Sequence, residues 1–161
     1  MRQRSSSLRL ALITLIGIVL GSAGGVAQQP SFAGTWHLNV AKSTYRPGPA
    51  PKSGVLNVQY KGTTRHSVLD TIAANGDKVR TEYAAVENGQ DYPLKGSPNA
   101  DTVSLRRSSP GTIERVDKRQ GQTVMFLVLR LSQDGKTMTV TQQGVTASGD
   151  KVSNTIVYEK R

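Results

Sequence analysis

Short extended segments separated by tight turns constrain the fold of this chain more than any other feature. Segment 78–86 is the clearest, because Val79, Thr81, Tyr83 and Ala85 alternate with polar residues and share one face of a strand. Turn signals rich in Gly, Asn and Asp stand between such segments, at 75–77, 87–89, 133–135 and 147–150. Connections this short join neighbouring antiparallel strands, so the sequence predicts an all-β meander without an amphipathic helix.

A long meander has two exposed edges unless it closes on itself. We therefore predict an antiparallel up-and-down β-barrel of 8–10 strands. A β-sandwich is the alternative, but it needs crossover connections that the short loops mostly forbid. Strands are expected at 34–40, 55–60, 65–73, 78–86, 101–107, 112–118, 123–131, 136–142 and 151–160, with weakly extended residues at 91–100.

Two segments depart from this regular pattern. Residues 41–53 contain Pro47, Pro49 and Pro51, which fix φ and remove backbone donors, so a long stiff connection is expected there. Segment 112–118 breaks its alternation between Ile113 and Val116, which predicts a β-bulge.

Residues 1–27 have the pattern of a signal peptide. A basic start is followed by the apolar run 10–20 and by small residues that end at Ala27. The run is shorter than the roughly 20 residues of a membrane span, although an uncleaved anchor is the alternative. Cleavage would leave residues 28–161 as one β-barrel domain, secreted or periplasmic, with no stable membrane anchor.

Composition excludes several kinds of chemistry. The chain has no cysteine, so disulfides, thiol catalysis and cysteine metal sites are excluded. Its two histidines, His37 and His66, are too few for a metal set, and no catalytic motif is present. The formal net charge is +10, but the basic residues are dispersed and do not form the dense stripe of a nucleic-acid-binding protein. We expect no catalytic residues, no metal, no cofactor and no nucleic-acid partner.

The triplet Gly34-Thr35-Trp36 at the head of the first strand resembles the Gly-x-Trp signature of the calycin superfamily of lipocalins, avidins and fatty-acid-binding proteins. The resemblance implies that Trp36, the single tryptophan, lies across the closed end of the barrel. It also implies a basic side chain from a late strand over the indole, where a cation adds about 0.5–2 kcal/mol. Arg130 and the terminal Lys160-Arg161 are the candidates, and Gly34, Trp36 and Arg130 form the expected barrel plug.

A wider resemblance covers nearly all of the mature chain. The stretches "GTWHLNVAKSTYRPGPAPKS", "DYPLKGSPNADTVSLRR" and "DGKTMTVT" are similar to small secreted bacterial proteins described as lipocalin-like and without an established activity. The ending "TIVYEK" resembles the last strand of fatty-acid-binding proteins. Ile156 stands where those proteins carry the arginine that helps grip a fatty-acid carboxylate, so carboxylate binding does not carry over.

The interior of the barrel leaves two functional hypotheses open. An eight-stranded barrel is just wide enough to be filled by side chains or to hold one small ligand. In the first hypothesis, the protein is a non-catalytic binder of a small apolar or amphipathic ligand, and the cavity is lined by His66, Tyr83, Met125, Leu127 and Tyr158. In the second, the core is filled, and the basic surface or an apolar outer patch binds an envelope component.

Segment 124–129, "VMFLVL", is apolar on both faces. If Met125 and Leu127 point inward, then Val124, Phe126 and Val128 point outward and would form an exposed apolar patch. We expect loop 41–53 to cover this patch, and the alternative is a second copy of the chain in a homodimer.

Overall fold

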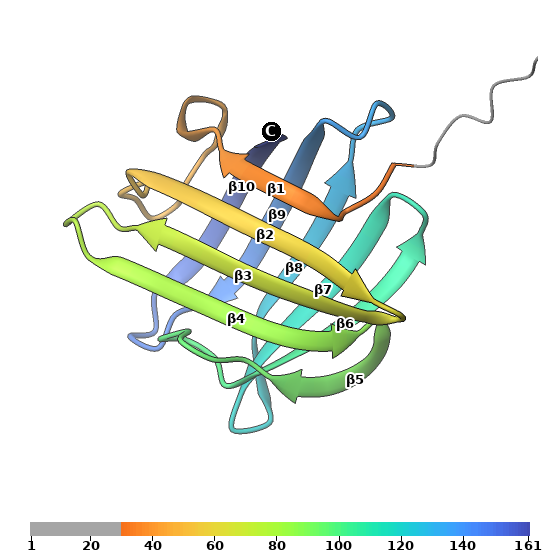
Figure 1. Ribbon diagram of the computed structural model, residues 1–161. Helices are drawn as coiled ribbons and strands as arrows, with labels where there is room; N and C mark the ends of the chain where they lie inside the picture. The colour runs from red at the N-terminus through yellow and green to blue at the C-terminus, as the bar shows by residue number, and fades with distance from the viewer. Residues whose placement is uncertain (1–29) are drawn as a thin grey trace, which may run out of the picture.

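The structure, a computed structural model, describes residues 30–161, and these form ten strands in one antiparallel sheet (Figure 1). The signal peptide predicted at 1–27 lies outside the described residues. The strands are β1 Gly34–Leu38, β2 Ser53–Lys61, β3 Thr64–Ile72, β4 Lys78–Val86, β5 Asn88–Pro93, β6 Thr102–Ser109, β7 Thr112–Arg119, β8 Gln122–Leu131, β9 Thr137–Val145 and β10 Lys151–Lys160, and a short 3₁₀ turn, η1, spans Val40–Lys42. No helix in this part of the chain is long and apolar enough to cross a membrane.

The sheet curls into a nearly closed barrel in which strands that follow one another in sequence are paired, except β4 and β5. The strand order is β4-β3-β2-β1-β10-β9-β8-β7-β6-β5, so the first and last strands pair. A gap remains between β4 and β5, and two backbone hydrogen bonds between Glu82 and Lys95 (2.9 and 3.0 Å) cross it. This confirms the up-and-down barrel and matches the architecture implied by the calycin resemblance.

Loop 41–53 does not cover the outer face of β8, so that prediction is wrong. Backbone hydrogen bonds join Thr44 to Thr155 and Arg46 to Ser153, which places the loop along β10. The reason is length: β1 ends at Leu38, whereas β10 runs from Lys151 to Lys160. The first half of β10 would otherwise present unpaired backbone groups, and the loop pairs with them in place of β1.

The outer face of β8 therefore keeps part of its apolar patch. Phe126 is 43% exposed and Val128 is half-buried. Val124 differs from the expectation, because it packs against the core and lines the interior. No partner chain is described, so the homodimer stays a prediction.

Val124 points inward because β8 has a β-bulge at this residue. The bulge predicted between Ile113 and Val116 of segment 112–118 is not found there. Asp117 pairs with Met125 and Lys118 pairs with Thr123, so β8 carries Val124 as an additional residue. On β7 the alternation is intact, with Ile113, Arg115 and Asp117 on the inner face. The apolar pattern is interrupted there because two of the inward positions are charged.

Trp36 belongs to the buried core, and its role as a plug at the closed end of the barrel stays a prediction. It is fully buried, and its Nε1–H donates to the carbonyl oxygen of Phe32 at 2.9 Å. The Nζ atom of Lys160 lies 4.8 Å from the centre of the indole. Gly34 makes this approach possible, because a Cβ atom there would come within 2.8 Å of Lys160 Cε.

Arg130 does not belong to this plug, which corrects the expected set. It is exposed on β8, where Met125, Leu127 and Leu129 are buried. Since side chains alternate along a strand, the spacing that places Leu129 inside places Arg130 outside. Of the candidates named from the sequence, Lys160 is the residue over Trp36.

Candidate functional site

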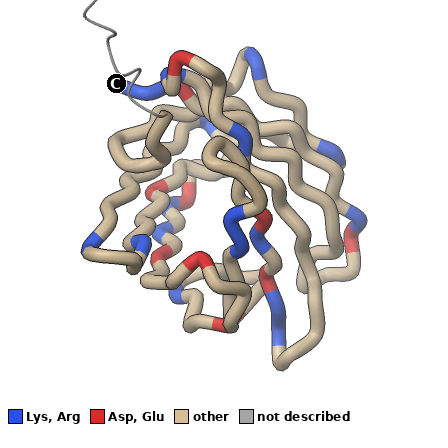
Figure 2. The backbone as a smooth tube through the Cα atoms, turned by 90° about the vertical axis from the view of Figure 1, so that its right-hand side faces the viewer, with Lys and Arg blue, Asp and Glu red and all other residues tan. Residues whose placement is uncertain are grey.

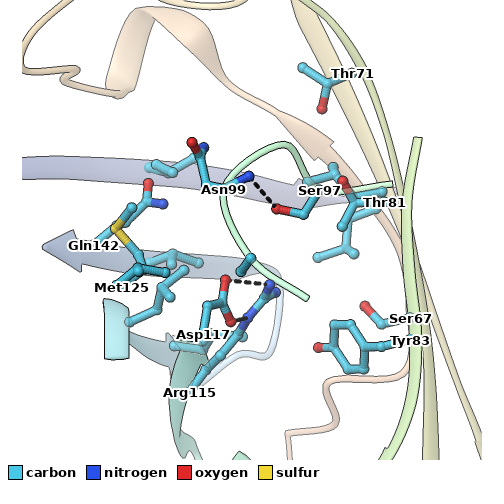
Figure 3. Close-up of a pocket in the computed structure, with 18 of the residues that line it drawn as sticks. Ser67, Thr71, Thr81, Tyr83, Ser97, Asn99, Arg115, Asp117, Met125 and Gln142 are labelled. Carbon is cyan, nitrogen blue, oxygen red and sulfur yellow. Dashed lines mark hydrogen bonds and ion pairs between the residues drawn. The ribbon is translucent and has the colours of Figure 1, made fainter. Parts of the chain in front are cut away.

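The barrel encloses a cavity of about 370 Å³ (Figure 3). A ten-stranded barrel is wider than an eight-stranded one, whose interior can be filled by side chains alone. The volume lies at the lower end of the range of small-molecule sites, about 300–1,000 Å³. Most of the wall is apolar, contributed by Leu56, Leu69, Val124, Met125, Leu127, Leu129, Val140 and Ile156. The cavity disfavours the filled-core alternative.

Four of the five residues predicted to line a cavity do so: Tyr83, Met125, Leu127 and Tyr158. His66 does not line it, and this placement is corrected. Arg65 and Ser67 are the buried inward residues of β3, so His66 between them lies on the outer face. The role of the four cavity-lining residues in ligand binding stays a prediction.

An ion pair stands inside the barrel on β7. Arg115 donates from Nε to Asp117 Oδ1 at 2.6 Å and from Nη2 to Oδ2 at 2.9 Å, and both side chains line the cavity. The Arg115 guanidinium also lies over the Tyr83 ring from β4, 5.1 Å from its centre. Burial lowers the pKa of Arg115, but the Asp117 carboxylate together with Tyr83 and Tyr158 outweighs it, so the pKa stays above its usual value.

A second guanidinium, that of Arg65 on β3, is fully buried. Its Nη1 donates to the Tyr60 hydroxyl at 3.4 Å and lies 3.9 Å from Glu87 Oε1. Its Cζ lies 5.4 Å from the centre of the Phe32 ring. Nε and Nη2 have no hydrogen-bond partner among residues 30–161, although Arg65 lines the cavity.

Glu87, the carboxylate nearest to Arg65, is bound more closely by other groups. It accepts from Arg107 Nε at 2.6 Å and from the Tyr60 hydroxyl at 2.6 Å. The Arg107 guanidinium lies 5.2 Å from the centre of the Phe32 ring, so Phe32 has contacts with two cations. Arg65, Arg107 and Glu87 therefore form a cluster next to Phe32, and Arg65 extends this cluster to the cavity wall.

Two cavity tyrosines have shifted pKa values in opposite directions. Burial raises the pKa of the Tyr83 phenol, but the positive charges of Arg65 and Arg115 outweigh it and hold the pKa below its usual value. The pKa of Tyr158 is raised, chiefly by burial and further by Tyr45. The two cavity phenols therefore differ in acidity, and Tyr158 stays protonated at neutral pH.

The segment between β5 and β6 covers part of the cavity mouth. Ser97, Asn99 and Ala100 line the cavity from this segment, as Figure 3 shows for Ser97 and Asn99. The Asn99 Oδ1 atom accepts from the Ala147 amide at 3.0 Å and so joins this segment to the β9–β10 turn. At Gly96, φ is +72°, and an added Cβ would overlap the carbonyl oxygen of a neighbouring β4 residue.

The site presents cationic groups, hydroxyls and one carboxylate. Its cationic groups and hydroxyls can orient a ligand, while Asp117, the carboxylate lining the cavity, is held by Arg115. Within residues 30–161, no group of three His, Asp or Glu side chains could hold a metal ion. Sequence reasoning missed Arg65, Arg115 and Asp117 as interior residues. Arg115 and Asp117 lie two and four residues after the apolar Ile113, and this spacing indicates that all three side chains share the inner face of the strand.

The surface is less distinctive than the interior. Figure 2 shows Lys and Arg distributed over several strands and turns, with Asp and Glu among them. Two exposed acids pair with exposed cations, as in Asp70 with Arg80 and Glu159 with Lys42.

No known sequence family matches the chain, and no curated protein matches it. Among solved structures, it is similar to zebrafish ileal bile acid-binding protein in complex with cholic acid, with a TM-score of 0.49 and 12% sequence identity. The match covers 81% of this chain and 98% of that chain. No residue role is transferred at this level of similarity, and the barrel architecture rests on the strand order of this chain itself.

Proposed function

We propose that the protein binds one small amphipathic molecule inside its barrel and acts without catalysis. The cavity carries the proposal: it is large enough for a small ligand, mostly apolar, and supplied with a few converging polar groups. Apolar walls favour transfer of an apolar ligand body from water, by about 25 cal/mol per Å². The polar groups on β3, β4 and β7 would fix its orientation.

The proposal includes the compartment. The pattern of residues 1–27 supports export, after which the mature domain would carry its ligand in the periplasm or outside the cell. N-terminal sequencing of the protein recovered from the periplasmic and culture fractions tests this part. A cytoplasmic protein that retains residues 1–27 would contradict it.

Native mass spectrometry of purified residues 28–161 tests the binding itself. We expect a co-purified small molecule, or uptake of one from an extract, with one ligand per chain. Val140→Phe is the matched loss-of-binding variant, because Val140 is buried on the cavity wall. Thr141→Phe places the same ring at the next position of β9, which lies on the outer face, and is the control.

Equal uptake by Val140→Phe and Thr141→Phe would show that the ligand binds elsewhere and would contradict the proposal. A wild-type protein that takes up no molecule would contradict it as well. Loss of uptake in Val140→Phe alone, with both variants folded by circular dichroism, supports binding in the cavity.

A further inference from the structure

The β-bulge on β8 is the feature that a general binding role leaves unexplained. Val124 stands between Thr123 and Met125, whose partners on β7 are consecutive residues, so Val124 has no partner of its own. Beyond Met125 the strand alternates regularly, with Leu127 and Leu129 buried. A bulge changes the direction of a side chain, and bulges are frequent next to functional sites.

The bulge turns two consecutive side chains into the barrel. Val124 and Met125 both line the cavity, and Val124 also packs against the buried core. In a regular strand, consecutive side chains point to opposite faces of the sheet, so Val124 would point to solvent if Met125 pointed inward. The bulge therefore occupies space that a regular strand would leave to a ligand.

The neighbouring strand β9 is shaped to accept this bulge. Gly144 lies opposite Met125, and a Cβ atom there would overlap the carbonyl oxygen of Val124 and come within 2.8 Å of Met125 Cα. Gly144 follows Val140 and Gln142, which line the cavity, on the same face of β9. The bulge of β8 thus fills the place that a side chain at position 144 would take.

Val124 lies at the end of the barrel where the segment between β5 and β6 covers part of the cavity mouth. The Asp101 amide, at the end of that segment, donates to the carbonyl oxygen of Lys118 at 2.9 Å, just before the turn into β8. Figure 3 shows Asn99 of this segment on the same side of the cavity as Met125. A side chain at this position meets the end of a ligand that extends from the interior toward the mouth.

We propose that Val124 determines the length of the ligand that the cavity accepts. This assignment rests on the binding function proposed above and adds a specificity-determining residue to it. Each methylene of a ligand that the apolar wall covers tightens binding about fourfold, equivalent to about 0.8 kcal/mol. A methylene that reaches Val124 adds no such gain, because the bulge holds this side chain in its path.

Neutral straight-chain alcohols from hexanol to dodecanol test this, because they differ only in length. Isothermal titration calorimetry with purified residues 28–161 gives each Kd. We expect the Kd of the wild type to fall about fourfold per added carbon up to a limiting length, and to stop falling beyond it. In Val124→Ala, which lacks two methyl groups, the limiting length should increase by about two carbons.

Deletion of Val124 is a second variant, because it removes the bulge together with the side chain. Thr123 and Met125 then become neighbours, as their partners on β7 already are, so the rest of the register is kept. This variant should accept longer alcohols than the wild type. The matched control is Val128→Ala, the same substitution at a half-buried outward position of the same strand, and it should keep the wild-type limit.

The outcomes separate this assignment from the function beneath it. If the limiting length is the same in the wild type and in Val124→Ala, or if Val128→Ala shifts it equally, Val124 does not set the limit and the binding function stands. A wild-type Kd that still falls at dodecanol also overturns the assignment. A wild type that binds none of the alcohols contradicts the binding function itself. Should the deletion variant not fold, Val124→Ala still decides the assignment.

Discussion

Removing one partner of the ion pair inside the barrel is expected to be far more harmful than removing both. Arg115 and Asp117 have side chains that are only 17% and 10% exposed, and two hydrogen bonds join them. Breaking a buried pair by deleting one partner typically costs about 3–5 kcal/mol, because the other charge is left uncompensated. Replacing both partners by apolar residues of similar volume is often neutral or stabilising.

We expect Asp117→Asn to lower the free energy of unfolding by about 3 kcal/mol, since the amide keeps one acceptor but loses the charge. Arg115→Met should lower it by a similar amount. The double variant Arg115→Met/Asp117→Leu should lie within about 1 kcal/mol of the wild type. A domain of this size is stable by only about 5–15 kcal/mol, so the single variants lose a large share of it.

Urea unfolding at neutral pH, followed by the fluorescence of Trp36, measures all of these values. The control is Asp70→Asn, which breaks the pair with Arg80 on the outer face, where side chains are 48% and 60% exposed. Pairs this exposed contribute about 0–1 kcal/mol. A loss below about 1 kcal/mol for Asp117→Asn would refute the reasoning, and so would a double variant that loses the sum of the two single losses.

Three further substitutions test other parts of the fold. Lys160→Met removes the cation over Trp36 and should lower the free energy of unfolding by about 1–2 kcal/mol in urea titrations; an unchanged value would mean that the contact adds no stability. Gly96→Ala should speed amide hydrogen exchange in the segment between β5 and β6, because a positive φ and a backbone overlap both oppose the added Cβ; unchanged exchange would show that the segment tolerates it. Phe126→Ser should change the free energy of unfolding by less than about 0.5 kcal/mol, and a lower mass in sedimentation than the wild type would identify the β8 patch as a dimer contact.

Local patterns predicted the strands well. The segments expected at 78–86 and 151–160 match β4 and β10 at both ends. Alternating side chains and short turns were enough to predict the strand bounds, because each hairpin is specified by residues that are close in sequence. The strand β5, at Asn88–Pro93, was read only as weakly extended, since Pro93 and nearby glycines obscure its pattern.

His66 was expected inside the barrel but lies outside, and the length of the turn between β3 and β4 accounts for the difference. A two-residue turn at Asn75-Gly76 would pair Tyr83 with Val68 and would place His66 inside with them. The observed loop is one residue longer and is closed by the Ala73 amide and the Asp77 carbonyl, so Tyr83 pairs with Ser67. Since side chains alternate, a shift of one residue moves every side chain of a strand to the other face.

The interior charges were missed for a different reason. Sequence patterns assign apolar residues to the inside, and on that basis the loss of alternation between Ile113 and Val116 predicted a β-bulge in segment 112–118. The rule holds for a filled core, but a barrel that encloses a cavity can carry polar groups on its inner face. The spacing of Arg115 and Asp117 with Ile113 was the available signal, and the register of β7 with β8 shows that the alternation of β7 is intact.

The cavity and the charged side chains of the interior lie in the same region of the barrel, and this supports the proposed binding function. Close to Trp36 the barrel is filled, with Phe32, Val58 and Met138 nearly inaccessible to solvent. The cavity adjoins this filled part, since Arg65 lines the cavity and lies 5.4 Å from the centre of the Phe32 ring, and the Arg115–Asp117 pair lies on the cavity wall as well. Defects without a role would be scattered, and each would be open to removal by a stabilising substitution. A cavity whose wall carries a few polar groups fits the proposed binding of one small amphipathic ligand, because such a ligand would fill the space and pair with those groups.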